Sequence, residues 1–160
     1  MSDTFGVPDI DGRRLPAVGY SVWPSGRLHL PESDDLAAAA AAKAAMAERG
    51  GWYKPDESRS DETLVDLACE ARASITRDGD WIEFDHDDEG DPKWSKQAIA
   101  FYVAIAPFVR SGVVHLEGED GARWSYAYEA GQMTQQGWSG WDGSVEPFGT
   151  YVDLPDQDHP

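Results

Sequence analysis

Carboxylates are the chemically most capable residues in this chain, and they are densest in one run, residues 78–91. The run reads DGDWIEFDHDDEGD and holds eight carboxylates without a Lys or Arg. Such a run can bind cations, or it can present phosphate-like charge to a basic protein surface. The residues of the run that we expect to contact a partner are Asp78, Asp80, Asp85, Asp87, Asp88, Glu89 and Asp91.

A calcium loop is the metal site closest to this pattern. Asp85, Asp87 and Glu89 would take ligand positions 1, 3 and 5, and Gly90 would take position 6. The bidentate Glu needed at position 12 is replaced by Lys96, a cation, which argues against a high-affinity site. A weak divalent site stays as an alternative to a solvated acidic loop. The histidines have no zinc spacing, so we predict no bound metal and no cofactor.

Catalytic constellations are weaker than this charge feature. Ser125, His115 and Glu117 share one predicted sheet face, but no oxyanion donor accompanies them. Carboxylate pairs of the glycosidase type are easy to find among 30 acids, and Trp-rich surfaces suit sugars. Phosphate-loop, dinucleotide, nucleophile-elbow and zinc-protease motifs are missing from the sequence. We predict no catalytic residue and keep a small carboxylate-dependent hydrolase or carbohydrate-binding domain as the alternative function.

Net charge bounds the class of partner. The chain has 30 acids against 13 bases, a formal charge of −17, which repels nucleic acid and anionic membranes and attracts basic proteins. This charge equals that of about 29 Å of duplex DNA. We therefore expect a non-catalytic, DNA-mimic-like inhibitor that masks a basic surface of a nucleic-acid-handling or defence protein. An immunity-type protein that neutralises a basic toxin is the third hypothesis, and a generally acidic proteome would also explain the charge.

Length and composition indicate one folded domain. A chain of 160 residues that is 41% hydrophobic and contains seven Trp can bury a real core, unlike an acidic disordered tail. We divide it into an irregular arm (1–17), a single α+β domain (18–136) and a Gly/Pro-rich extension (137–160). The extension either wraps the domain or projects as a recognition arm, in which case Trp138 and Trp141 are candidate partner anchors.

The elements that must position the acid run are predicted from local signals. Turn residues Pro24–Gly26 predict an N-terminal hairpin over 18–30. An Ala-rich helix should begin at its Ser33 cap and end at Gly50, and a second helix should cover about 61–74 behind Ser60. A short strand is expected at 81–85. The central core helix should span about 96–109, capped by Ser95 and bent at Pro107.

A β-meander near 113–136 is the clearest strand signal. Strands 113–118 and 122–129 flank the loop Glu119-Asp120-Gly121, a favoured three-residue hairpin connection. The implied register pairs Gly118 with Ala122 and places Glu117 opposite Arg123. Residues 132–136 supply the third strand. The predicted core face carries Val114, Leu116, Trp124, Tyr126 and Tyr128.

Three pieces of this region, APFVRSG, VVHLEGEDG and RWSYAYEAG, resemble small uncharacterised acidic proteins of actinobacteria and their phages. The resemblance implies an accessory or host-interaction role and transfers no active-site residue. The N-terminus lacks an apolar signal region, and the longest apolar stretch, 98–109, is too short to span a bilayer. We therefore expect a cytoplasmic protein without membrane association, of unassigned oligomeric state.

Overall fold

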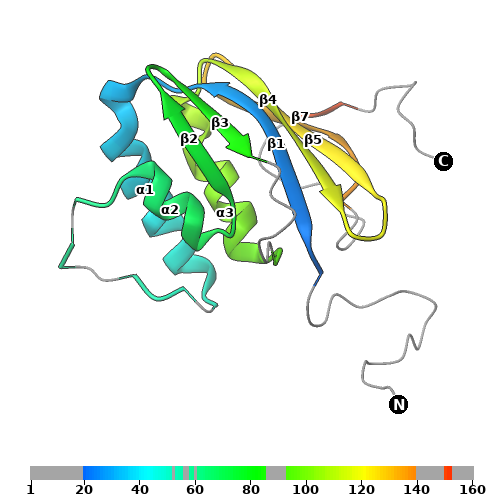
Figure 1. Cartoon of the computed structure of the whole chain (residues 1–160), viewed down its shortest axis with the longest axis horizontal. Helices are drawn as coiled ribbons and strands as arrows, with labels where there is room; N and C mark the ends of the chain where they lie inside the picture. Colours follow the sequence, from blue (N-terminus) through cyan, green and yellow to red (C-terminus); the bar gives the residue numbers. More distant parts are fainter. Residues whose placement is uncertain are drawn as a thin grey trace.

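The computed structural model describes residues 20–51, 53–55, 58–59, 61–85, 93–139 and 150–152. These residues form three α-helices and a seven-stranded sheet, which confirms the predicted α+β class (Figure 1). The elements are β1 (Val22–His29), α1 (Asp35–Arg49), α2 (Leu64–Glu70), β2 (Ser74–Asp78), β3 (Trp81–Asp85), α3 (Lys96–Ile105), β4 (Ser111–Gly118), β5 (Arg123–Glu129), β6 (Gln132–Gly137) and β7 (Thr150–Val152). Short 3₁₀ turns at Glu32–Asp34 and Ala106–Phe108 precede α1 and follow α3.

The sheet is open, and its strands follow the order β2-β3-β1-β4-β5-β6-β7. Every neighbouring pair is antiparallel except β6 and β7, which run parallel. The three helices lie on one side of this sheet (Figure 1). Side chains therefore alternate along each strand between a buried position under the helices and a position on the other side.

The core lies between the sheet and the helices, and α3 is its centre, as predicted. Phe101, Tyr102 and Ile105 of α3 are at most 1% exposed. Ser95 caps this helix by accepting a hydrogen bond from the backbone N–H of Ala98 at 3.1 Å. The α-helix ends at Ile105 and continues as a 3₁₀ turn through Pro107, in agreement with the expected break.

The predicted meander is also confirmed. β4 and β5 pair in the expected register, with Val114 opposite Tyr126 and Glu117 opposite Arg123. β6 follows as the third strand. The five residues assigned to the core face are all buried: Val114, Leu116, Trp124, Tyr126 and Tyr128.

The N-terminal hairpin over 18–30 was a wrong prediction. Residues 22–29 form one continuous strand, β1, which lies between β3 and β4 in the sheet. Pro24 is tolerated inside it because pairing with β3 begins only at Gly26, so Pro24 has a neighbour on the β4 side alone. Gly26 does adopt a positive φ of 133°, but it uses this freedom to approach the backbone of β4 and not to turn the chain.

The first two helices begin later than predicted. α1 starts at Asp35 after a 3₁₀ turn, without a side-chain cap from Ser33, and it ends at Gly50 as expected. α2 starts at Leu64 and is capped by Thr63, whose hydroxyl accepts from Asp66 N–H while the Asp66 carboxylate accepts from Thr63 N–H. The helix also ends earlier than predicted, at Glu70 rather than near residue 74, and residues 74–78 form strand β2, which was not predicted.

Buried tyrosines couple the stability of this fold to alkaline pH. Burial raises the pKa of Tyr102 and Tyr128 well above the ordinary value of 10.0, and the Tyr128 hydroxyl donates a hydrogen bond to the backbone carbonyl of Tyr102 at 2.9 Å. The folded state holds these protons more tightly than the unfolded state, so the stabilisation is complete below pH 10 and falls as pH rises beyond it.

We therefore expect tyrosinate absorbance from the buried rings to appear only together with unfolding in an alkaline titration. The absorbance at 295 nm and the far-ultraviolet circular dichroism should change in one cooperative step above about pH 10. Ionisation of all six tyrosines with unchanged dichroism would contradict the burial of this pair.

Candidate functional site on the open face of the sheet

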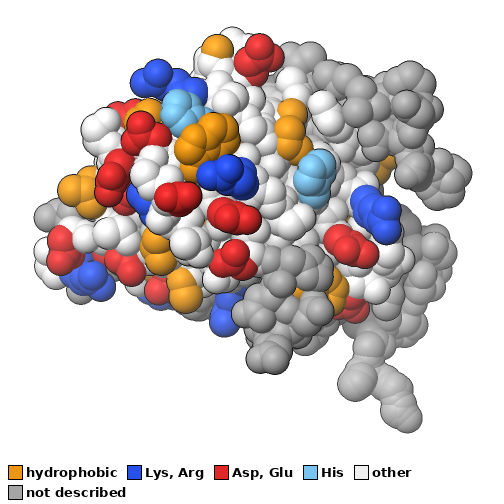
Figure 2. Space-filling view, turned by 45° about the horizontal axis from the view of Figure 1, so that its top comes forward, with side chains coloured by type: hydrophobic (Ala, Val, Ile, Leu, Met, Phe, Trp, Pro, Cys, Tyr) orange, Lys and Arg blue, Asp and Glu red, His pale blue; other side chains and the backbone are white. Residues whose placement is uncertain are grey.

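The candidate site is the side of the sheet that faces away from the helices, hereafter the open face. Residues that alternate with the buried core positions place their side chains there, and none of the described helices covers them (Figure 1). Its charged and aromatic members in β1 to β5 are Trp23, Arg27, His29, Asp78, Trp81, Glu83, Asp85, His115, Glu117, Arg123 and Glu129. In the space-filling view, acidic, basic, histidine and hydrophobic side chains are interspersed (Figure 2).

A cluster of Arg27, His29 and Trp81, hereafter the Arg27–Trp81–His29 cluster, occupies the β1–β3 part of the open face. The rings of His29 and Trp81, directly opposite each other in the register, have centroids 5.0 Å apart. The Arg27 guanidinium lies 4.8 Å from the Trp81 ring centroid, in cation–π geometry. Arg27 is also opposite Glu83 across the strand pair. These contacts immobilise an aromatic ring and a guanidinium on a rigid sheet, which is the arrangement of an interface anchor.

Two of the predicted contact residues flank this cluster. Asp78 is exposed and lies opposite Trp81, while Asp85, at the other end of β3, accepts a hydrogen bond from the Thr76 hydroxyl at 3.2 Å. The four residue steps along the strand from Trp81 to Asp85 separate the two ends of the hairpin by about 13 Å. Asp78 and Asp85 therefore border the cluster from two ends, with Glu83 between them, and do not form one compact group.

Asp80 has a structural role. Its carboxylate accepts a hydrogen bond from the backbone N–H of Glu32 at 2.9 Å, and its carbonyl accepts one from Leu30 N–H at 2.9 Å. The β2–β3 turn thus holds the chain where it leaves β1 and enters the turn before α1. Among the described contact candidates, Asp80 and Asp85 thus both use a carboxylate oxygen within the fold, Asp80 for a backbone N–H and Asp85 for a hydroxyl.

Of the remaining predicted contact residues, the structure describes only Trp138. Trp138 follows β6 and is 45% exposed, which leaves nearly half of its surface within reach of a partner. Asp87, Asp88, Glu89, Asp91 and Trp141 lie outside the described residues. Their contribution to a contact surface stays a prediction.

The β4–β5 part of the open face holds the serine, histidine and glutamate of the sequence hypothesis. His115 Nδ1 lies 3.0 Å from the Ser125 hydroxyl, the two residues being opposite each other. Glu117 lies in the next row, opposite Arg123. His115 is exposed, so a group bound here would stay in contact with water, which does not favour nucleophilic catalysis.

Exposed acids also occur away from the open face. Glu48 lies in the last turn of α1, and Glu119 and Asp120 form the β4–β5 turn, where they accept hydrogen bonds from the Ser21 backbone at 2.8 Å and from the Tyr20 hydroxyl at 2.6 Å. The charge of the described residues is therefore distributed around the molecule. Charge alone would therefore attract a basic partner to several surfaces. The Arg27–Trp81–His29 cluster is the feature that distinguishes the open face from the other surfaces.

Sequence reasoning missed Arg27, His29 and Trp81 as a group. They become neighbours only because β1 pairs with β3, more than fifty residues later in the chain. A signal was available at Trp81, because strand alternation over 81–85 places this large aromatic on the same side as Glu83 and opposite Ile82 and Phe84.

Neither metal chemistry nor membrane insertion gains support from the residues that the structure describes. Within them, no group of three or more His, Cys, Asp or Glu side chains is placed to hold a metal ion. None of their helices has the length and apolar character needed to cross a membrane. Comparison with known proteins found no matching family model, no matching curated protein and no matching solved structure.

Proposed function

We propose that this protein is a non-catalytic binding protein that masks a basic surface of a nucleic-acid-handling or defence protein with its open face. The observation that carries the proposal is the Arg27–Trp81–His29 cluster bordered by exposed carboxylates. Interfaces draw most of their affinity from a few aromatic and arginine anchors surrounded by polar residues. The open face has this composition on a rigid support.

Charge then determines which partner the open face accepts. The side chains of β1 to β5 on this face include five carboxylates and two guanidiniums, and the whole chain carries −17. Complementary charge speeds association and excludes acidic competitors, while desolvated anchors slow dissociation. A basic protein surface satisfies both requirements. A basic toxin would do so equally well, and it differs only in the identity of the partner.

Sugar binding is the alternative with the same residue types, and the geometry disfavours it at Trp81. A carbohydrate ring stacks on the flat face of an aromatic side chain. The Arg27 guanidinium already lies over the Trp81 ring, 4.8 Å from its centroid. A sugar would have to displace this contact and desolvate the neighbouring charges.

Matched charge reversals test the proposal. We expect Glu83→Lys, on the open face, and Trp81→Ala to abolish capture of a basic partner by the immobilised protein. Glu48→Lys, at the end of α1, makes the same charge change on the helical side and should leave capture intact. The partner's affinity should fall at least about tenfold between 0.1 and 0.5 M salt.

Two results would contradict the proposal. Equal loss in Glu83→Lys and Glu48→Lys would show that capture follows net charge and not the open face. Unchanged circular dichroism of the variants is the control that lost capture does not reflect unfolding. Capture of acidic or neutral partners alone by the unmodified protein would contradict the charge argument.

A further inference from the structure

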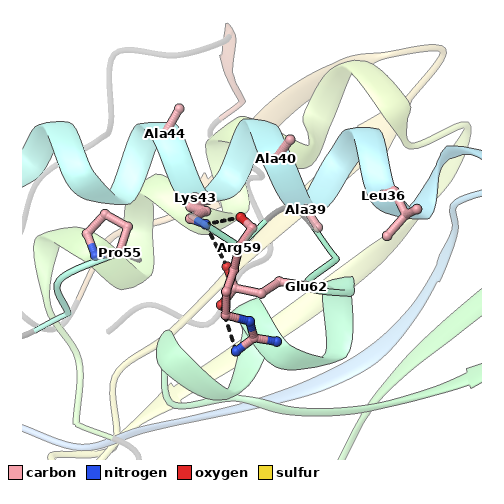
Figure 3. A pocket seen from close by; sticks show the side chains of 8 residues that line it. All are labelled: Leu36, Ala39, Ala40, Lys43, Ala44, Pro55, Arg59 and Glu62. Atoms are coloured by element: carbon pink, nitrogen blue, oxygen red, sulfur yellow. Dashed lines mark hydrogen bonds and ion pairs between the residues drawn. The ribbon is translucent and has the colours of Figure 1, made fainter. Parts of the chain in front are cut away.

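A second candidate site is a pocket on the helical side of the molecule. The sheet separates this pocket from the open face. The pocket has a volume of about 370 Å³, in the range of small-ligand sites, and lies between α1 and the segment that connects α1 to α2. Figure 3 shows α1 as one wall, with Lys43 reaching from it toward Arg59 and Glu62. The apolar lining residues are Leu36, Ala39, Ala40, Ala44 and Pro55.

The polar end of the pocket is a largely buried ion pair. Lys43 Nζ lies 2.9 Å from Glu62 Oε1 and donates a hydrogen bond to the Arg59 carbonyl at 2.7 Å. The Lys43 and Glu62 side chains are only 15% and 10% exposed. Their charges compensate each other, and the pair ties the connecting segment to α1. It therefore shapes the pocket without presenting net charge to it.

Arg59 supplies the charge that remains in the lining. Its side chain is 49% exposed, and its ion pairs are loose: 3.4 Å to Asp61, itself 81% exposed, and 3.9 Å to Glu62. An exposed pair of this kind exchanges readily with solvent. The planar guanidinium can then take a second carboxylate in the bidentate geometry that arginine favours.

We propose that this pocket binds a small carboxylic acid with an apolar body, such as a medium-chain fatty acid. The apolar body lies along the alanine, leucine and proline wall, and the carboxylate pairs with Arg59. Screening confines the repulsion of an anion to acids within about 8 Å at physiological ionic strength, so most of the chain's negative charge does not act on the pocket. The acids that pair with Arg59 are Asp61 and Glu62; Glu62 is also paired with Lys43, and the exposed Asp61 is the carboxylate with which the ligand competes for Arg59.

Titration of the full chain with octanoate tests the proposal, with octan-1-ol and octylammonium as probes of equal chain length. We expect saturable binding of octanoate with a Kd of about 1 mM or tighter, followed by calorimetry and by amide shifts in the NMR spectrum. The shifts should concentrate at the pocket lining. Octan-1-ol should bind at least about tenfold more weakly, and octylammonium should not bind.

Matched variants separate the pocket from general surface binding. Arg59→Gln should weaken octanoate at least about tenfold, whereas Arg49→Gln, at the end of α1 and outside the pocket, should not. Ala44→Phe should fill the pocket and block binding, whereas Ala47→Phe, exposed on the same helix and outside the lining, should not. Absence of saturation, equal affinity for octan-1-ol, or equal effects in each matched pair would overturn the proposal. The test is independent of the open face, so it can fail while the proposed function stands.

Discussion

Replacing Gly112 with alanine should destabilise the protein by about 4 kcal/mol or more, or prevent it from folding. Gly112 lies in β4 opposite Leu28 of β1, at the centre of the sheet, with φ at 125°. A Cβ atom there would lie 2.3 Å from the carbonyl oxygen of Arg27 and 2.8 Å from the Cα of Leu28. Both obstacles are backbone atoms of a paired strand, so relief requires β1 and β4 to separate.

Gly121→Ala is the matched control, because it separates backbone strain from collision. Gly121 in the β4–β5 turn also has a positive φ, 87°, but an added Cβ would meet nothing within 4 Å. It should cost about 1 kcal/mol through strain alone. Urea unfolding followed by tryptophan fluorescence gives both values. Equal losses in the two variants would show that the close approach of β1 and β4 does not limit stability.

The close approach of β1 and β4 also shows why only part of the fold could be predicted from local sequence patterns. The β4–β5 hairpin, the strand at 81–85 and the Ser95 cap depend on residues within a few positions of one another, and all three were predicted correctly. Pro24–Gly26 has the composition of a turn, yet it lies in a strand. The glycines at 26 and 112 let β1 and β4 pair closely, and that pairing spans about ninety residues of sequence.

The prediction of where α2 ends was wrong for a related reason. The helix prediction ran to about residue 74 and left β2 unpredicted, because residues 74–78 contain a single buried apolar side chain, Ile75, and show little strand alternation. Their pairing with β3 through a short turn at Gly79 and Asp80 decides the outcome. The polar cluster around Gln97 was equally invisible: its side chain bonds Met46 and Tyr53, which are brought to it only by packing.

The candidate site likewise has a part that the sequence predicts and a part that depends on strand order. Acidic character at Asp78 and Asp85 follows from composition, and the structure places both on the open face. The Arg27–Trp81 contact follows from strand order, which one sequence does not reveal. Charge could therefore be predicted to attract a basic partner, but the surface that would hold it could not.

A second large effect is expected at the largely buried pair Asp35 and Arg77, which joins four segments of the fold. Arg77 Nη2 and Nε lie 2.5 and 3.1 Å from Asp35 Oδ1, and Arg77 Nη1 donates to the carbonyl of Leu30 at 2.7 Å. Asp35 Oδ2 accepts from the backbone N–H of Leu64, the first residue of α2, at 2.9 Å. The two side chains are 13% and 14% exposed, so neither charge is well hydrated.

The stability losses of the two single variants should therefore add up to more than the loss in the double variant. Arg77→Met or Asp35→Leu alone leaves a poorly hydrated charge without its counter-ion and should lower the free energy of unfolding by about 3 kcal/mol. The double variant leaves neither charge, so its loss should fall short of the sum by about 2 kcal/mol. Asp61→Ala breaks the exposed Arg59–Asp61 pair and should change stability by less than about 0.5 kcal/mol. Urea denaturation of the parent protein, the two single variants and the double variant closes this cycle, and strict additivity would mean that the pair acts through packing and not through charge.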